Sequence, residues 1–368
     1  MDKLTRCTRC ILPENYPDIR FNADGVCNVC EEFDQQWGNW SETNWTSNKK
    51  RLDRILKNVH KLNRNYDCLV PFSGGKDSTY VLYLCTKVLN LKVLAVNFSN
   101  GFQTAEALDN IRKAVEILEV DLITYKPNLK LYRDLAKGFL FNAGEGCTPC
   151  NIGVVLAINR IAEKEKIPII FSGVSRKSDE RSPKKIYMSG GKYFLKVIRK
   201  AGLTGSIKGS FYADQERQLG FSFRMRRKLA RMVLMDKGVF RFLPKKLAVR
   251  NSVMLQMPDF IEWDESVIYK TIGEELGWSA SDVGNEHTDC MINPVKSYLR
   301  YHRWGFGSKT QKLAALVRDG QMDREQALLE SKEEEEVPKN LTYFMKELDL
   351  SEEEMERIYG TTHDEFIS

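Results

Sequence analysis

One stretch decides the fold of this chain: Val70-Pro71-Phe72-Ser73-Gly74-Gly75-Lys76-Asp77-Ser78-Thr79. It follows an apolar run at residues 66–72 that is typical of a buried strand, and it opens a segment with a helical apolar face. The N-terminus of a helix offers unpaired N–H groups and a partial positive charge. Two adjacent glycines let the backbone approach an anion, Ser73 and Ser78 add hydroxyl donors, and Lys76 adds a positive charge. The stretch therefore predicts a phosphate-binding loop, although its spacing is not that of the GxxxxGK(S/T) loop.

Three further apolar runs, at residues 92–98, 121–125 and 167–173, are also typical of strands. Helical segments lie between them, and one has an apolar stripe at Leu108, Ile111, Val115 and Leu118. This alternation predicts an α/β fold, a parallel sheet with helices on both faces. The loop then lies at the carboxyl edge of the sheet, where such folds bind their ligands.

The order strand, SGGKDS, helix resembles the signature of the PP-loop ATP pyrophosphatases, which have a HUP-like fold and include GMP and NAD synthetases, asparagine synthetase and tRNA thiolation enzymes. The resemblance implies that ATP is cleaved between its α and β phosphates, that the loop holds pyrophosphate, and that AMP is transferred to a substrate oxygen. Lys76 and Asp77 would be catalytic, with Asp77 as a Mg²⁺ ligand. The implied nucleotide-binding residues are Ser73, Gly74, Gly75, Lys76, Asp77, Ser78, Asn97, Phe98, Ser99 and Gly173. Asp179 and Glu180 are further candidates for holding metal.

Four N-terminal cysteines form a second motif. Cys7-x-x-Cys10 and Cys27-x-x-Cys30 have the spacing of two zinc knuckles, with Gly25 placed for a sharp turn. The alternative is a set of free thiols. Four thiolates leave Zn²⁺ no open position, so we expect an N-terminal zinc ribbon that stabilises a segment too small for its own core.

The whole chain resembles the N-acetyl sugar amidotransferases of bacterial surface-polysaccharide clusters. The resemblance rests on the stretches Cys7–Pro13, Phe21–Cys30, Val70–Tyr80, Tyr298–Gly307 and Asp319–Ala327. It implies conversion of an acetamido group to an acetamidino group during lipopolysaccharide biosynthesis, with ATP activating the amide oxygen and ammonia displacing AMP. The four histidines are scattered and no glutaminase triad is visible. Ammonia is therefore expected from a separate glutaminase subunit, and the family implies a cyclase-like companion as well.

Three other cysteines support an alternative. Cys147-x-x-Cys150 with the remote Cys290 resembles the 4Fe-4S site of PP-loop tRNA thiolases, and thiolates are soft ligands suited to such clusters. If a cluster forms, sulfur transfer to tRNA or a small molecule becomes the competing function. A buried structural pair or a second zinc site remains open. A zinc-ribbon adaptor with a degenerate nucleotide fold is disfavoured because the SGGKDS loop is intact.

Charge is distributed unevenly along the chain. The net charge is +6, but residues 176–250 contain 21 Lys/Arg against 5 Asp/Glu, and residues 330–368 contain 4 against 13. The basic segment favours an anionic partner, such as an anionic sugar or nucleotide sugar. Its run Arg224–Arg231 with nearby phenylalanines would also suit RNA, which we favour less than a partner subunit or anionic substrate. The four glutamates at 333–336 are expected to form a solvated helix end or hinge.

Composition sets the remaining expectations. No run approaches ~18 apolar residues, so no membrane span is expected, and the N-terminus lacks the apolar region of a signal peptide. Nine cysteines without such a signal favour the cytoplasm. The expected parts are a zinc-binding cysteine module (1–34), a helical linker (35–65), the nucleotide-binding domain (66–180), a basic substrate or partner region (181–308) and a mainly helical C-terminal region (309–368).

Overall fold

The structure is a computed structural model that describes residues 4–38, 42–144, 146–175, 252–281 and 289–360. The chain divides into two compact units. The first comprises Met1–Tyr125, Ala157–Glu180 and Asn251–Asn340, and the second comprises Lys126–Leu156, Arg181–Arg250 and Leu341–Ser368. The five-part division expected from the sequence stays a prediction. The basic segment, with Arg224–Arg231 and the pair Asp179 and Glu180, lies outside the described residues.

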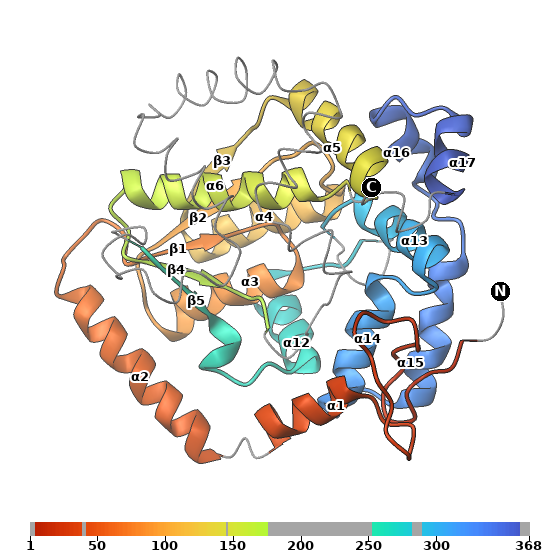
Figure 1. The fold of residues 1–368 in the computed structure, drawn as a ribbon. Helices are drawn as coiled ribbons and strands as arrows, with labels where there is room; N and C mark the ends of the chain where they lie inside the picture. The colour runs from red at the N-terminus through yellow and green to blue at the C-terminus, as the bar shows by residue number, and fades with distance from the viewer. Residues whose placement is uncertain (1–3, 39–41, 145, 176–251, 282–288, 361–368) are drawn as a thin grey trace, which may run out of the picture. The chain divides into compact units, whose positions relative to one another are not determined.

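A five-stranded parallel sheet forms the centre of the first unit. Its order is β3-β2-β1-β4-β5, which Figure 1 shows from the edge at β3 to the edge at β5. The strands are β1 (Cys68–Pro71), β2 (Val93–Phe98), β3 (Asp121–Tyr125), β4 (Ile169–Ser172) and β5 (Val253–Gln256). The four predicted strands are confirmed. Strand β5 was not predicted, because its Val253 and Met254 are exposed and give no buried apolar run.

Side chains on both faces of the central strands are buried. In β1 and β4, Cys68, Val70, Ile169 and Phe171 belong to one core cluster with residues of the flanking helices. The alternate residues Leu69 and Ile170 are also buried. Because successive side chains of a strand point to opposite faces, the sheet is covered on both sides, as parallel sheets require.

Helices connect the strands and follow them. In the first unit they are α1 (Asn28–Phe33), α2 (Glu42–His60), α3 (Lys76–Tyr83), α4 (Ala105–Leu118), α12 (Glu265–Leu276), α13 (Ile292–Trp304), α14 (Ser308–Arg318) and α15 (Arg324–Ser331). One predicted apolar stripe needs a correction: Leu108 of α4 is 51% exposed, and Ala107 and Ala114 are buried beside Ile111 and Leu118 instead. The start of α4 packs closely against the phosphate-binding loop at Ala107, a contact that a search for large apolar residues overlooks.

The second unit is helical in its described part. It contains α5 (Leu129–Ala143), the first part of α6 (Thr148–Lys164), α16 (Leu341–Glu347) and α17 (Glu352–Gly360). Lys137 of α5 pairs with Glu354 of α17 at 3.1 Å. At the start of α17, the backbone N–H groups of Ser351 and Glu354 donate to each other's side chains, which is a capping box. None of the described helices is both long enough and apolar enough to cross a membrane.

Candidate nucleotide-binding site and cysteine cluster

The SGGKDS loop joins β1 to α3 at the carboxyl edge of the sheet, and Gly75 is the residue that caps α3. Gly74 has a φ of +85°, and a Cβ atom there would lie 2.3 Å from the carbonyl oxygen of Ala107. Only glycine fits this position, since both the conformation and the space exclude a side chain. The indole of Trp278 and the amide of Asn110 donate to the Gly74 carbonyl at 2.9 and 3.3 Å, which fixes the loop.

A cavity of about 390 Å³ lies against this loop. Ser73, Gly75, Lys76, Asp77 and Ser78 of the loop line it. The end of β4 contributes Gly173, whose Cα lies so close to α3 that a Cβ would meet Asp77 at 3.0 Å. The structure therefore brings six of the predicted nucleotide-binding residues to one cavity, in the crevice between β1 and β4.

Four predicted residues are not among those that line the cavity: Gly74, which lies in the loop itself, and the three residues of the Asn97–Ser99 segment. Among the described residues that line the cavity, none belongs to the Asn97–Ser99 segment at the end of β2. Asn97 is buried and donates to the Phe72 carbonyl at 2.9 Å, and Phe98 stacks on Tyr125. Both contacts stabilise the edge of the sheet, and a role in binding adenosine stays a prediction.

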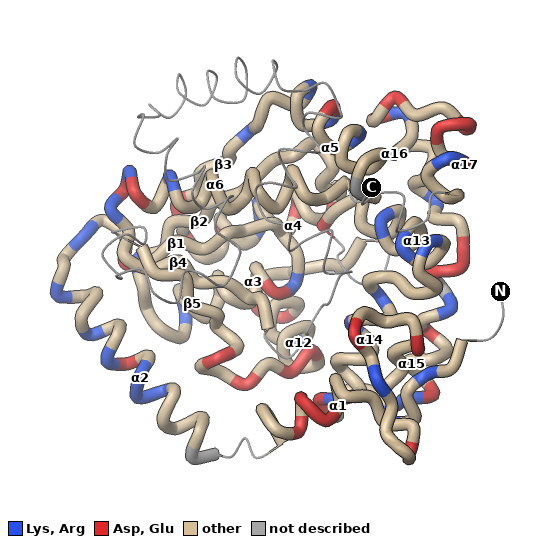
Figure 2. Tube along the Cα trace, viewed as in Figure 1, with Lys and Arg blue, Asp and Glu red and all other residues tan. Residues whose placement is uncertain are grey.

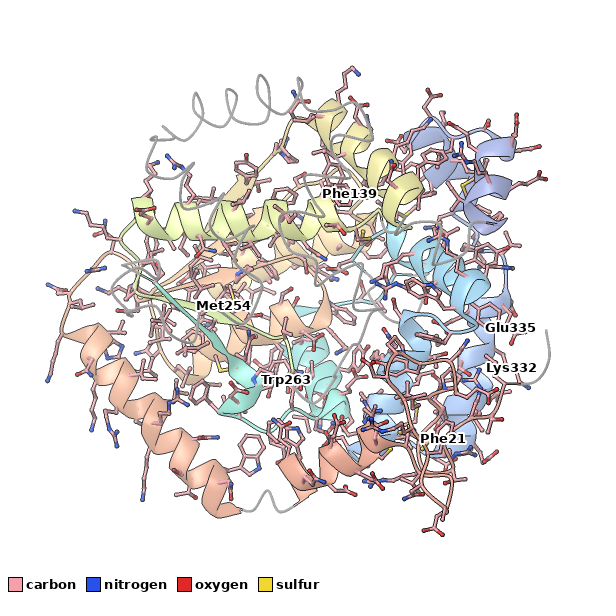
Figure 3. The ribbon with its side chains drawn as sticks, viewed as in Figure 1. Phe21, Phe139, Met254, Trp263, Lys332 and Glu335 are labelled. Carbon is pink, nitrogen blue, oxygen red and sulfur yellow. The ribbon has the colours of Figure 1, made fainter. Side chains whose placement is uncertain are left out.

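The wall opposite the loop comes from α12, α14 and the chain near them, none of which the sequence analysis assigned to the site. Glu265 and Tyr269 of α12, Ser308 and Lys312 of α14, and Asp289 line the cavity together with Trp263, Ala315, Leu316, Asp319 and Gln321. Trp263 lies just before α12 (Figure 3), and its indole donates to Asp77 at 3.1 Å. Figure 2 shows several acidic positions along the segment that leads into α12. A sequence signal for this wall exists between Ser308 and Asp319, where the cavity-lining residues are three or four positions apart and therefore lie on one face of a helix.

Lys76 is held by two carboxylates. Its Nζ lies 2.8 Å from Asp77 and 2.9 Å from Glu265, and its side chain is 9% exposed. Burial by itself would lower the pKa of Lys76, but the charges of Asp77 and Glu265 outweigh burial and raise the pKa above its usual value. Lys76 therefore remains an ammonium group at the surface of the cavity, able to pair with phosphate oxygens.

One acidic residue behaves differently from the expectation. The run at 333–336 was expected to be solvated, but Glu334 is 4% exposed. Its carboxylate accepts from the backbone N–H groups of Gly307 and Lys309 at 2.9 and 2.7 Å, and from the hydroxyls of Ser297 and Thr310. The carboxylate thus caps the N-terminus of α14, the helix that carries Lys312. Composition could not reveal this role, because the donors lie far away in the sequence.

The four N-terminal cysteines form a closed cluster. Their side chains are fully buried and all four sulfurs lie within 4.8 Å of one another. The Cys7–Cys30 and Cys10–Cys27 sulfur distances are 3.9 and 3.8 Å. Four sulfurs about 2.3 Å from a tetrahedral Zn²⁺ would be about 3.8 Å apart, so the donor set fits this metal. Backbone N–H groups of Cys10 and Cys27 donate to the Cys7 sulfur, as expected for a knuckle that stabilises thiolates.

Arg324 connects this cluster to the C-terminal segment. Its guanidinium donates to the carbonyls of Cys7 and Cys10 at 3.0–3.3 Å. Tyr16 packs against Phe306 with ring centroids 5.2 Å apart, and Asn15 donates to the Trp304 carbonyl. A Cβ at Gly307 would lie 2.2 Å from Glu334, so this glycine packs a turn. The motif stretches at both ends of the chain therefore meet in one structural assembly within the first unit.

The remaining cysteines divide between two groups. Cys68 and Cys85 are fully buried in the core. Cys147 and Cys150 belong to the second unit and Cys290 to the first, where the strand segment at Cys290 bridges to Gln103. An iron–sulfur cluster at these three residues stays a prediction. Among the described residues, the Cys7, Cys10, Cys27 and Cys30 group is the set of metal-ligating side chains that the geometry brings together.

The loop, the parallel sheet, the cysteine cluster and the helical C-terminal region define an α/β protein with an anion-binding loop at the carboxyl edge of a parallel sheet. Residues 278–367 match the family model described as LPS biosynthesis protein WbpG-like, C-terminal domain. This match confirms the resemblance to surface-polysaccharide proteins seen in the sequence. The matched residues include Asp289, Lys312, Asp319 and Gln321 of the cavity.

Two further likenesses are weaker. Uncharacterized protein MJ1599 of Methanocaldococcus jannaschii is 24% identical over 298 residues, which are 81% of this chain and 83% of that protein. The solved structure of U34-tRNA thiolase NcsA from Methanococcus maripaludis with its 4Fe-4S cluster has 13% identity and a TM-score of 0.36, covering 100% of this chain and 96% of the other.

Proposed function

We propose that the chain is an ATP-dependent amidotransferase that converts the acetamido group of an N-acetyl sugar into an acetamidino group in lipopolysaccharide biosynthesis. The observation that carries the proposal is the SGGKDS loop facing a cavity whose other wall includes residues of the WbpG-like domain. Nucleotide and acceptor would meet in this cavity. The geometry suits a reaction that needs orientation and charge stabilisation more than a strong base.

The reaction has two balanced steps. The amide oxygen of the acceptor forms a bond to the α-phosphorus of ATP, and pyrophosphate leaves toward the loop. Ammonia then adds to the activated carbon, one proton of the added nitrogen passes to solvent, the carbon–oxygen bond breaks, and AMP leaves with the former amide oxygen. Lys76 would neutralise charge on the leaving phosphates. Asp77 would hold Mg²⁺.

Partners and cofactors follow from this chemistry. ATP and Mg²⁺ would bind at the loop, and Zn²⁺ would occupy the cysteine cluster in a structural role. Ammonia would come from a glutaminase subunit that works with a cyclase-like companion. The acceptor would be an anionic sugar or nucleotide sugar, which the basic segment would suit, whereas a nucleic acid is less favoured.

The decisive experiment labels the acetyl oxygen of the acceptor with oxygen-18. Incubation with ATP, Mg²⁺ and ammonium should place the label in AMP and give equal amounts of AMP, pyrophosphate and the acetamidino sugar. Lys76→Ala and Asp77→Ala should abolish AMP formation. Unlabelled AMP, or full activity in either variant, would refute the proposal. Iron and sulfide in anaerobically purified protein, with sulfur entering the product, would establish thiolation instead.

A further inference from the structure

Two lysine ammonium groups converge on one carboxylate oxygen in the cavity. Lys76 Nζ lies 2.9 Å from Oε1 of Glu265, and Lys312 Nζ lies 3.3 Å from the same oxygen. Lys76 comes from the loop and Lys312 from α14, and both line the cavity. The side chains of Lys312 and Glu265 are each 22% exposed, so solvent screens this arrangement only partly.

Two ammonium groups so close together repel each other unless an anion lies between them. Here the Glu265 carboxylate is that anion. Its oxygen has the surroundings that a phosphate oxygen would need, two charged donors at hydrogen-bond distance on the surface of an open cavity. Asp77 neutralises Lys76 further, at 2.8 Å, whereas Glu265 is the one carboxylate among the described residues within ion-pair distance of Lys312.

Glu265 is fixed in this position by the backbone around it. Asp264 caps α12 by accepting from Ser266 and Val267, and the N–H of Glu265 donates to the side chain of Gln321 at 3.1 Å. Gln321 also donates to the Trp263 carbonyl and to Asp319. The Glu265 carboxylate is therefore held near the loop, because these hydrogen bonds connect the start of α12 to the residues that follow α14.

We propose that Lys312 is a second pyrophosphate-binding cation, placed opposite the loop, and that Glu265 holds the Lys76–Lys312 pair until phosphate oxygens take its place. The proposal deepens the proposed function, because the bound anion is the pyrophosphate part of ATP. It gives α14, within the WbpG-like domain, a direct part in nucleotide binding. Asp289 and Asp319 also line the cavity, so the anion is expected to enter with Mg²⁺, which offsets their charge.

The test measures binding of inorganic pyrophosphate with Mg²⁺ to the full chain by calorimetry, so it needs no acceptor and no turnover. Lys312→Gln should weaken binding about tenfold, equivalent to ~1.4 kcal/mol, because a charged hydrogen bond is lost. Lys312→Arg keeps the charge and should remain within about threefold of the wild type. Glu265→Gln should tighten binding about threefold or more, because the competing carboxylate is gone. Lys130→Gln, an exposed position in the second unit, is the matched charge control and should bind as the wild type does.

Two results would overturn the proposal: wild-type affinity in Lys312→Gln, or weaker binding in Glu265→Gln. Unchanged thermal unfolding of each variant shows that the affinities report the site. If AMP is unlabelled in the oxygen-18 experiment but the variants show the expected pyrophosphate affinities, the amidotransfer reaction is rejected and pyrophosphate binding by the Lys76–Lys312 pair is still supported. Labelled AMP with unchanged affinity in Lys312→Gln would reject the cation pair alone.

Discussion

Replacing the buried carboxylate of Glu334 should destabilise the protein far more than replacing its exposed neighbour. Each oxygen of Glu334 accepts from one backbone N–H, of Gly307 or of Lys309, and from one hydroxyl. In Glu334→Gln one oxygen becomes an NH₂ group. The facing hydroxyl can rotate to accept from it, but the facing N–H cannot: that of Gly307 would lose its bond to Glu334, and that of Lys309 would keep only its longer bond to Ser297, at 3.3 Å.

The magnitude follows from this count. An unsatisfied buried N–H costs about 1–3 kcal/mol, and the remaining bonds lose the strength that the charge gave them. We therefore expect a loss of about 3 kcal/mol in the free energy of unfolding, and a decrease in Tm of about 6 °C or more. Glu336, in the same acidic run, is exposed, so Glu336→Gln should change stability by less than ~0.5 kcal/mol.

Urea unfolding followed by circular dichroism measures the difference between the two variants. Because Glu334 caps the helix that carries Lys312, the Glu334→Gln protein should also bind pyrophosphate more weakly. Equal stability of Glu334→Gln and Glu336→Gln would refute the view that Glu334 is a structural cap, whatever the activity of either variant.

Three more predictions concern the loop and the cysteine cluster. The Gly74→Ala variant should lose nucleotide binding and about 2 kcal/mol or more of stability, because the added methyl group would meet the Ala107 carbonyl and the residue has a positive φ. Calorimetry measures the ATP affinity and thermal unfolding the stability, and a wild-type ATP affinity would contradict the prediction. Purified protein should contain about one zinc per chain, and the Cys27→Ser variant should lose this metal. Without zinc, the N-terminal module should be cleaved faster by a protease. An unchanged zinc content in Cys27→Ser would exclude this site. Arg324→Ala should speed proteolysis of the same module without removing zinc, with Lys130→Ala as the surface control; equal cleavage rates would show that the guanidinium contacts do not hold the module.

Much of the nucleotide-binding side of the site could be predicted, because the residues that would bind phosphate follow one another directly in the sequence. The loop from Ser73 to Ser78 contains its own glycines, hydroxyls and cation, and the strand before it is recognisable from apolar residues alone. The two Cys-x-x-Cys pairs are similarly local, since each knuckle needs only four residues. The capping box of Ser351 and Glu354 is local for the same reason, since its two residues are three positions apart.

The cavity wall opposite the loop could not be predicted, because the role of each of its residues depends on contacts that form only when the chain folds. Glu265 and Lys312 are ordinary charged helix residues in the sequence, and Glu334 is one of four consecutive glutamates. Apolar periodicity also failed at Leu108, which is exposed while the neighbouring Ala107 packs against Gly74, and at β5, an edge strand with exposed valine and methionine.

The sequence by itself determined the parallel sheet, the anion-binding loop at its carboxyl edge and the four-cysteine cluster, because local spacing and hydrophobic alternation encode each of them. Only the tertiary structure decided that α12 and α14 close the cavity, that one carboxylate lies between two lysines, and that a buried glutamate caps the helix bearing one of them. These depend on the positions of charges from distant segments, and the energy of a charge is set by its surroundings after folding.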